Sequence, residues 1–146
     1  MKKMILTLAL VASMVVVVNA QADTKNIGVR LTYGAEISYQ QPLGSSNRLE
    51  IDAGLWAFNA LSATAIYQWV WDLSEVATGL NWYAGFGAGL LTYENFFGVG
   101  PFGQVGIEYN FNIPLQLSLD YRPGWYIFPN SGYSYEGIAL GVRYKF

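Results

Sequence analysis

The chain has 146 residues, enough for one domain of ordinary size and too few for two. Only 12% of its residues are charged, against roughly 25% in typical soluble domains, whereas 16% are aromatic. It contains no cysteine and no histidine, which excludes disulfides, thiolate metal sites and the mechanisms that use either residue as nucleophile or general base. The net charge of -2 argues against a nucleic-acid partner, which requires a basic face.

The first 22 residues have the features of a cleaved signal peptide. Two lysines precede an apolar run over residues 4–18, and the small residues Ala20 and Ala22 occupy the positions that a signal peptidase recognises. The apolar run is shorter than the ~20 residues that a membrane-spanning helix needs. We therefore expect residues 1–22 to be removed on export and residues 23–146 to form the mature domain.

Alternation of apolar and polar residues with period two runs through almost the whole mature chain, which predicts β-strands with two different faces and no helix. In the first segment, Ile27, Val29 and Leu31 alternate with Gly28 and Arg30. Seven such segments are evident, whereas roughly 10 residues per membrane-spanning strand predict about eight. An even number is also expected because an exported barrel begins and ends in the periplasm.

An eighth strand requires one of the segments to contain a hairpin. The favoured position is the Tyr33-Gly34-Ala35 step, because Gly34 can adopt the positive φ of a tight turn. The alternative is a turn at Pro123-Gly124, which would leave a very short strand before Pro129. The favoured assignment places the eight strands at 27–33, 35–41, 48–58, 62–72, 80–92, 99–111, 113–127 and 137–146.

The charged residues indicate which face points inward. None of the charges in the alternating segments lies on the apolar face. The polar face carries glycines, Trp56, Phe58 and Phe102 among a few charges, which makes a poor solvent surface and a suitable narrow interior. The charge-free face suits lipid, where a charge near the midplane costs ~2–4 kcal/mol. The pattern predicts an all-β fold, an eight-stranded antiparallel up-and-down transmembrane β-barrel.

Outward aromatic residues gather at the predicted periplasmic strand ends, as in the interfacial girdle of membrane barrels. The members of this girdle are Tyr39, Trp69, Trp71, Trp82, Tyr109, Phe111, Tyr144 and Phe146. A thinner external set comprises Tyr33, Tyr121, Trp125 and Phe128.

The charged residues on the inward face are nearly balanced, six acidic against five basic, as a closed network of ion pairs requires. Glu50 and Asp52 share this face and offer an alternative reading as a catalytic carboxylate pair or a divalent-cation site. The favoured interpretation is a lumen network. It comprises Arg30, Glu36, Glu50, Asp52, Glu108, Asp120, Arg122 and Arg143, together with Arg48.

The chain resembles the small eight-stranded outer-membrane β-barrel proteins of Gram-negative bacteria, OmpA/OmpX-like in architecture. The resemblance covers the mature chain and rests most on the segment 106–123 (GIEYNFNIPLQLSLDYRP). It also rests on the ending VRYKF, where Val142 and Tyr144 precede the terminal Phe146 as in the assembly signal of such barrels. The resemblance implies insertion from the periplasm by the barrel-assembly machinery. It implies no single activity, since relatives include structural proteins, adhesins, invasins and a few lipid enzymes.

The leading functional hypothesis is a monomeric outer-membrane protein in contact with lipid, with a structural or surface-interaction role and no cofactor. Catalysis is disfavoured because the lipid-modifying barrels that this chain resembles in size depend on a histidine. Two alternatives remain: a narrow channel, disfavoured because side chains fill an eight-stranded interior, and a secreted soluble lipocalin-like carrier of an apolar ligand. The segment 128–136, with Asn130, Tyr133 and Tyr135, offers a modest surface for an external partner of unknown identity.

Overall fold

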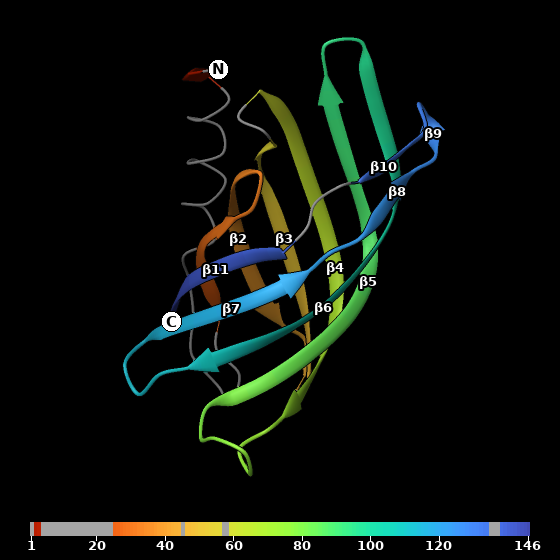
Figure 1. Ribbon diagram of the computed structural model, residues 1–146. Coiled ribbons are helices and arrows are strands. Elements are labelled where there is room, and N and C mark those ends of the chain that lie inside the picture. Colours follow the sequence, from red (N-terminus) through yellow and green to blue (C-terminus); the bar gives the residue numbers. More distant parts are fainter. Residues whose placement is uncertain (1, 4–24, 45, 57–58, 135–137) are drawn as a thin grey trace.

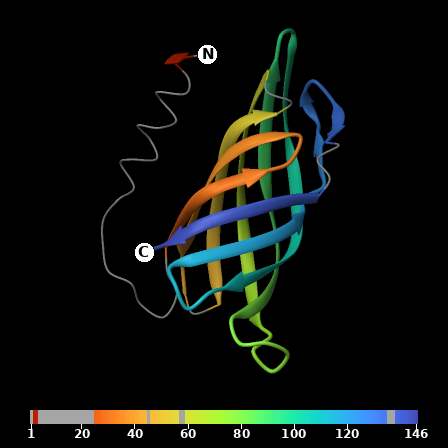
Figure 2. The same cartoon turned by 60° about the vertical axis from the view of Figure 1, so that its left-hand side comes forward.

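The computed structural model describes residues 2–3, 25–44, 46–56, 59–134 and 138–146. The predicted cleavage site after Ala22 and most of the predicted signal peptide therefore lie outside the described residues. Among the residues that are described, no helix is both long enough and apolar enough to cross a membrane. The strands between Asn26 and Lys145 form one curved sheet that closes on itself (Figures 1 and 2).

Consecutive strands pair antiparallel from β1 to β7, and β11 pairs with both β7 and β1, so the sheet closes into a ring of eight strands. The short strands β8, β9 and β10 extend the wall at one end. The predicted all-β, eight-stranded antiparallel barrel is confirmed. The strands are β1 (Asn26–Leu31), β2 (Gly34–Pro42), β3 (Asn47–Trp56), β4 (Ala60–Asp72), β5 (Leu80–Tyr93), β6 (Phe96–Asn110), β7 (Leu115–Tyr121), β8 (Gly124–Tyr126), β9 (Phe128–Pro129), β10 (Gly132–Ser134) and β11 (Ile138–Lys145).

The extra hairpin lies at the favoured position, between β1 and β2. Leu31 pairs with Ala35, and the chain reverses over Thr32, Tyr33 and Gly34. The predicted positive φ of Gly34 is wrong, because among the described residues positive φ occurs only at Gly79 and Glu94. Gly34 instead begins β2 as an ordinary ladder residue opposite β3, so this reversal needs no left-handed residue.

No hairpin forms at the alternative position, Pro123-Gly124. β7 and β8 both run along β6, with Asp120 opposite Gly106 and Gly124 opposite Phe102. Proline has no N–H to donate to a ladder, and Pro123 interrupts the strand without reversing it. Its carbonyl still accepts a hydrogen bond from the Gly103 N–H at 2.9 Å. The predicted strand 113–127 therefore runs along β6 without reversing, as β7 and β8, and it begins two residues later than expected.

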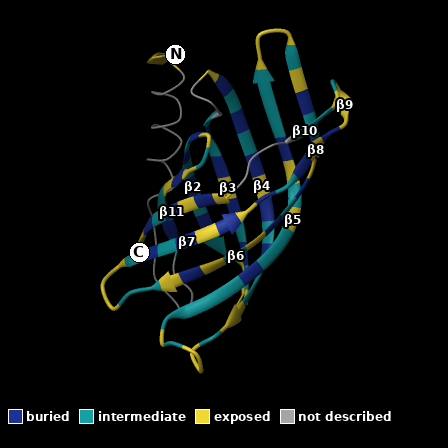
Figure 3. Ribbon diagram, in the orientation of Figure 1, coloured by how far each residue is buried: buried dark blue, intermediate teal, exposed yellow. Residues whose placement is uncertain are grey.

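Burial alternates along the strands with the period-two pattern of the sequence (Figure 3). The buried side is mostly polar. In β2, for example, Glu36, Ser38 and Gln40 are buried while their neighbours are partly exposed. Among the described side chains, a small cluster of apolar residues packs inside the barrel toward the β5–β6 turn. The members of this internal cluster are Ile66, Phe102 and Tyr126, with Leu91 and Phe96 packed against them.

Aromatic rings meet on the outer wall at the end where β1 begins and β11 finishes. Trp71 lies opposite Trp82 in the β4–β5 ladder, and the two rings stack with centroids 4.1 Å apart. At the same end, Tyr109 contacts Phe111 and Tyr144 stacks on Phe146. The predicted gathering of outward aromatics at this end is therefore present.

The wall differs in height around the barrel. β1 has six residues, whereas β5 has 14 and β6 has 15. The β5–β6 hairpin consequently rises well past the β1–β2 turn (Figures 1 and 2).

Candidate functional site

The candidate site is the set of charged side chains in the barrel interior. The structure brings all eight predicted lumen residues together, and Arg48 joins them. Each of the nine is at most 8% exposed, and each forms at least one ion pair. They come from β1, β2, β3, β6, β7 and β11 and from the link between β7 and β8.

One part of the network joins three neighbouring segments of the wall through Glu36. The Arg30 Nη1 donates to the Glu36 carboxylate at 2.9 Å, and the Arg122 Nη2 donates to it at 2.8 Å. Arg30 also reaches Asp120, 90 residues away in the sequence, at 2.5 Å. Glu36 is thus held by two guanidinium groups, and Arg30 by two carboxylates. Charge-assisted hydrogen bonds of this kind are the stronger class of hydrogen bond.

Arg122 extends the network to β3 and β4. Its Nη1 donates to the Asp52 Oδ2 and to the Thr64 hydroxyl, both at 2.8 Å. The guanidinium of Arg122 is fully buried, and it fixes three partners from β2, β3 and β4 at once. This side chain therefore links three strands of the wall from inside the lumen.

A second part of the network lies nearer the end of the barrel that carries the aromatic rings. Arg48 donates through both terminal nitrogens to the two carboxylate oxygens of Glu108, at 3.0 and 2.7 Å. Its Nε donates to the Gln68 side chain at 2.6 Å. The guanidinium also lies 4.9 Å from the centre of the Tyr83 ring, a cation–π distance.

The third part of the network surrounds Glu50. Arg143 donates to Glu50 at 3.3 Å and also to the hydroxyls of Ser38 and Ser118. The Glu50 carboxylate further accepts hydrogen bonds from the amides of Gln40, Gln68 and Gln104. Buried glutamines are the network members that the charge-based analysis missed. The signal that identifies them is their position on the inward, polar face of each strand.

The reading of Glu50 and Asp52 as a divalent-cation site is not favoured by the geometry. Arg143 and Arg122 already donate to these two carboxyls. Across the described ranges, no group of three or more acidic residues is placed to hold a metal ion. The arrangement serves to link strands across the barrel through ion pairs.

The predicted assembly signal closes the barrel. Val142 pairs with Val29 of β1 and Leu117 of β7, and Tyr144 is exposed on the outer wall. The Phe146 N–H donates to the Lys25 carbonyl at 2.8 Å, which ties the end of the chain to the residue that precedes β1. Recognition of this ending by an assembly machinery stays a prediction.

The predicted partner surface belongs to the extension formed by β8, β9 and β10. The Tyr133 ring packs edge-on against Trp125, with centroids 5.0 Å apart, and the Asn130 amide donates to the Asn95 carbonyl at 3.4 Å. Phe128 is 72% exposed. Tyr135 lies outside the described residues.

The chain matches no protein-family model, no curated protein and no solved structure. A functional conclusion therefore has to rest on the distribution of side chains over the two faces of the wall.

Proposed function

We propose that this protein is an integral outer-membrane β-barrel with a sealed lumen, acting as a structural or surface-interaction protein without catalysis. The observation that carries the proposal is the inversion of the usual burial pattern. Among the described residues, 18 buried side chains are polar or charged and six are hydrophobic, while 22 large hydrophobic residues are exposed. A soluble domain buries its hydrophobic residues and pairs or exposes its charges. Hydrocarbon around the barrel accounts for the inversion.

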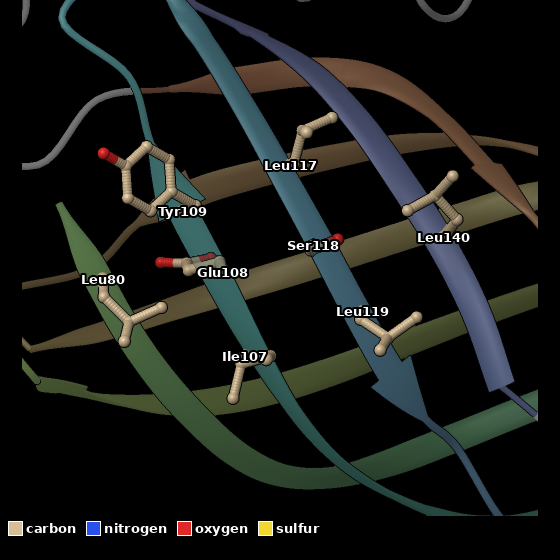
Figure 4. A pocket seen from close by; sticks show the side chains of 8 residues that line it. All are labelled: Leu80, Ile107, Glu108, Tyr109, Leu117, Ser118, Leu119 and Leu140. Carbon is tan, nitrogen blue, oxygen red and sulfur yellow. The ribbon is translucent and has the colours of Figure 1, made fainter. Parts of the chain in front are cut away.

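The outer wall offers apolar hollows that suit lipid chains. In one of them, Leu80, Ile107, Leu117, Leu119 and Leu140 project from β5, β6, β7 and β11 (Figure 4). A neighbouring hollow on the same wall is lined by further apolar residues. They include Trp82, Val105, Tyr121 and Ile138. Acyl chains would fill such shallow hollows at no cost in polar desolvation.

The aromatic pairs support one orientation in the membrane. Trp and Tyr residues concentrate at membrane–water interfaces. The end with the stacked Trp71 and Trp82 would lie at the periplasmic interface, and the β5–β6 hairpin would extend outside the cell. This orientation agrees with export through a signal peptide over residues 1–22 and with insertion from the periplasm by the assembly machinery. External partners would meet the extension that carries Trp125 and Phe128.

The soluble-carrier alternative has less support. A carrier of an apolar ligand needs an apolar chamber, whereas the described part of the lumen is crossed by ion pairs such as Arg30–Asp120 and Arg48–Glu108. The small internal cluster around Phe102 is already packed with its own aromatic rings.

The decisive experiment is fractionation combined with gel mobility. The mature protein should remain in urea-washed membranes and, in detergent, migrate differently before and after boiling, because a closed barrel resists the detergent until heated. Recovery in the soluble periplasmic fraction, together with a single mobility in all samples, would contradict the membrane proposal and favour the carrier.

The channel alternative predicts ion conductance, whereas a lumen sealed by ion pairs predicts none. Because the ion pairs of Arg30, Glu36, Asp120 and Arg122 cross the lumen, we expect the purified protein to give no steady ohmic conductance in planar bilayers. Detergent alone, added at the same dilution, is the control. Reproducible ohmic steps that scale with protein concentration would show that the lumen opens.

A further inference from the structure

The charges buried in the lumen do not balance. In the described part of the interior there are four guanidinium groups and five carboxyl groups. If all nine were ionised, the interior would hold one uncompensated negative charge. An uncompensated buried charge is costly, and the usual outcome is that the group binds a proton and becomes neutral. The lumen therefore needs one more positive charge, and the geometry indicates where a proton would supply it.

Glu50 is surrounded by hydrogen-bond donors. Its Oε1 accepts from the Gln104 amide at 3.2 Å, and its Oε2 accepts from Gln40 at 2.6 Å. The same Oε2 accepts from Gln68 at 3.0 Å and from Arg143 at 3.3 Å. A carboxyl group with four donors around its two oxygens is in the ionised, acceptor-only form.

Asp52 is differently placed. Its Oδ2 accepts from Arg122, but its Oδ1 is buried and no donor among the described residues reaches it. Glu50 and Asp52 are fully buried, two residues apart on the same inward face of β3. Two ionised carboxylates placed side by side repel each other, whereas a carboxylic acid can donate to a carboxylate. With a proton bound, Oδ1 would itself donate a hydrogen bond, so it would no longer be a buried acceptor without a partner.

We propose that Asp52 is a neutral carboxylic acid at neutral pH, its Oδ1–H donating to the Glu50 carboxylate, and that this bound proton neutralises the lumen. Glu36 is excluded as the holder because two arginines donate to it. Glu108 and Asp120 are excluded because each accepts at least two hydrogen bonds from one guanidinium. The inference concerns the interior alone, so it holds whether lipid or water surrounds the barrel.

The strands on both sides of Asp52 place no charged side chain directly beside it. Ser38 and Thr64 flank it in the ladders of β2 and β4 and carry no charge. The charged or titratable side chains that interact with the Glu50–Asp52 pair are Arg30, Glu36, Arg48, Tyr83, Arg122 and Arg143. Neither Tyr83 nor any of the arginines titrates near neutral pH, so a proton bound between pH 5 and 8 belongs to a carboxyl.

The test compares wild type with Asp52→Asn, whose amide has the same shape and can donate to Glu50 while its carbonyl accepts from Arg122. Folding in detergent micelles is followed by tryptophan fluorescence across a urea titration between pH 5 and 8. An unfolded Asp loses its proton near pH 4, so the wild type must take up one proton on folding. The folding constant of the wild type, divided by that of the variant, should then fall about tenfold for each unit by which the pH is raised. A ratio that is constant above pH 5 would mean that Asp52 is ionised and would overturn the proposal.

A second measurement does not depend on the variant being stable. The infrared spectrum of the folded wild type at pH 7 should contain a carboxylic-acid C=O band. Glu75→Gln, which removes an exposed acid in the β4–β5 connection, should retain this band, and Asp52→Asn should lack it. Absence of the band in wild type, or its presence in Asp52→Asn, would overturn the assignment. So would a wild-type stability that depends on sodium at constant ionic strength, because a metal cation would then supply the missing charge.

Discussion

Replacing Leu119 by arginine is expected to lower the free energy of unfolding from lipid vesicles by about 2–4 kcal/mol, the cost of a cation facing hydrocarbon. Leu119 is 46% exposed on the outer wall, midway along the strand that β7 and β8 form. Its ladder neighbours are Ile107 and Leu140, so no acidic side chain is near on the same face. Urea titration of the vesicle-inserted protein, followed by tryptophan fluorescence, measures the change.

Ile113→Arg is the matched control. Ile113 is 60% exposed, also on the outside, but it lies in the connection between β6 and β7 rather than in the wall. In the proposed orientation the new cation meets water and headgroups, at an expected cost of about 0–1 kcal/mol. In a soluble barrel both substitutions would lie on an exposed surface and change stability by roughly 0.5 kcal/mol or less. Equal, small effects would therefore contradict the lipid-facing wall.

Arg122→Met is expected to destabilise the barrel by about 3–5 kcal/mol, because removing one partner of a buried ion pair leaves the others uncompensated. The side chain is fully buried, and its loss removes one of the two arginines that donate to Glu36, together with the hydrogen bonds to Asp52 and Thr64. Methionine retains much of the volume, so the effect reports lost charge rather than a cavity. The measurement is the midpoint of urea unfolding in the same vesicles.

Lys145→Met removes a cation at the rim and serves as the comparison. Lys145 is only partly buried, and its Nζ donates to the Phe111 carbonyl at 3.3 Å. We expect a loss of less than about 1 kcal/mol. Adding Glu36→Gln to Arg122→Met should restore part of the loss, since one unpaired carboxylate disappears. If Arg122→Met were as mild as Lys145→Met, the lumen network would not be a source of stability.

The two faces of the wall were predictable because successive residues of a strand point to opposite sides of the sheet. The alternation of Ile27, Val29 and Leu31 with Gly28 and Arg30 is reproduced along the wall. This alternation does not tell how far along the barrel axis a residue lies. Asp72 shows the consequence: it lies on the polar face in the sequence, but it is the last residue of β4, where it is exposed and accepts hydrogen bonds from the Ser74 N–H and hydroxyl.

Ion-pair partners were not predictable from the sequence. Arg30 bonds to Asp120 across 90 residues, and Arg143 to Ser38 across 105. Such partners depend on the register at which β11 meets β1, which is set only when the barrel closes. The Gly34 prediction failed for a related reason. A glycine in a reversal is compatible with several backbone conformations, and the three-residue reversal between Leu31 and Ala35 uses none with positive φ.

The unequal wall heights have a mechanical consequence for a surrounding bilayer. At about 3.3 Å per residue, the paired part of β1 spans only about 20 Å, whereas β6 spans about 50 Å. The apolar band of a membrane barrel is ~25 Å tall, so β1 is too short to cross it, whereas β6 is more than long enough. Hydrophobic mismatch on one flank thins the adjacent leaflet. A barrel of this shape would deform a surrounding membrane asymmetrically, thinning it most beside β1.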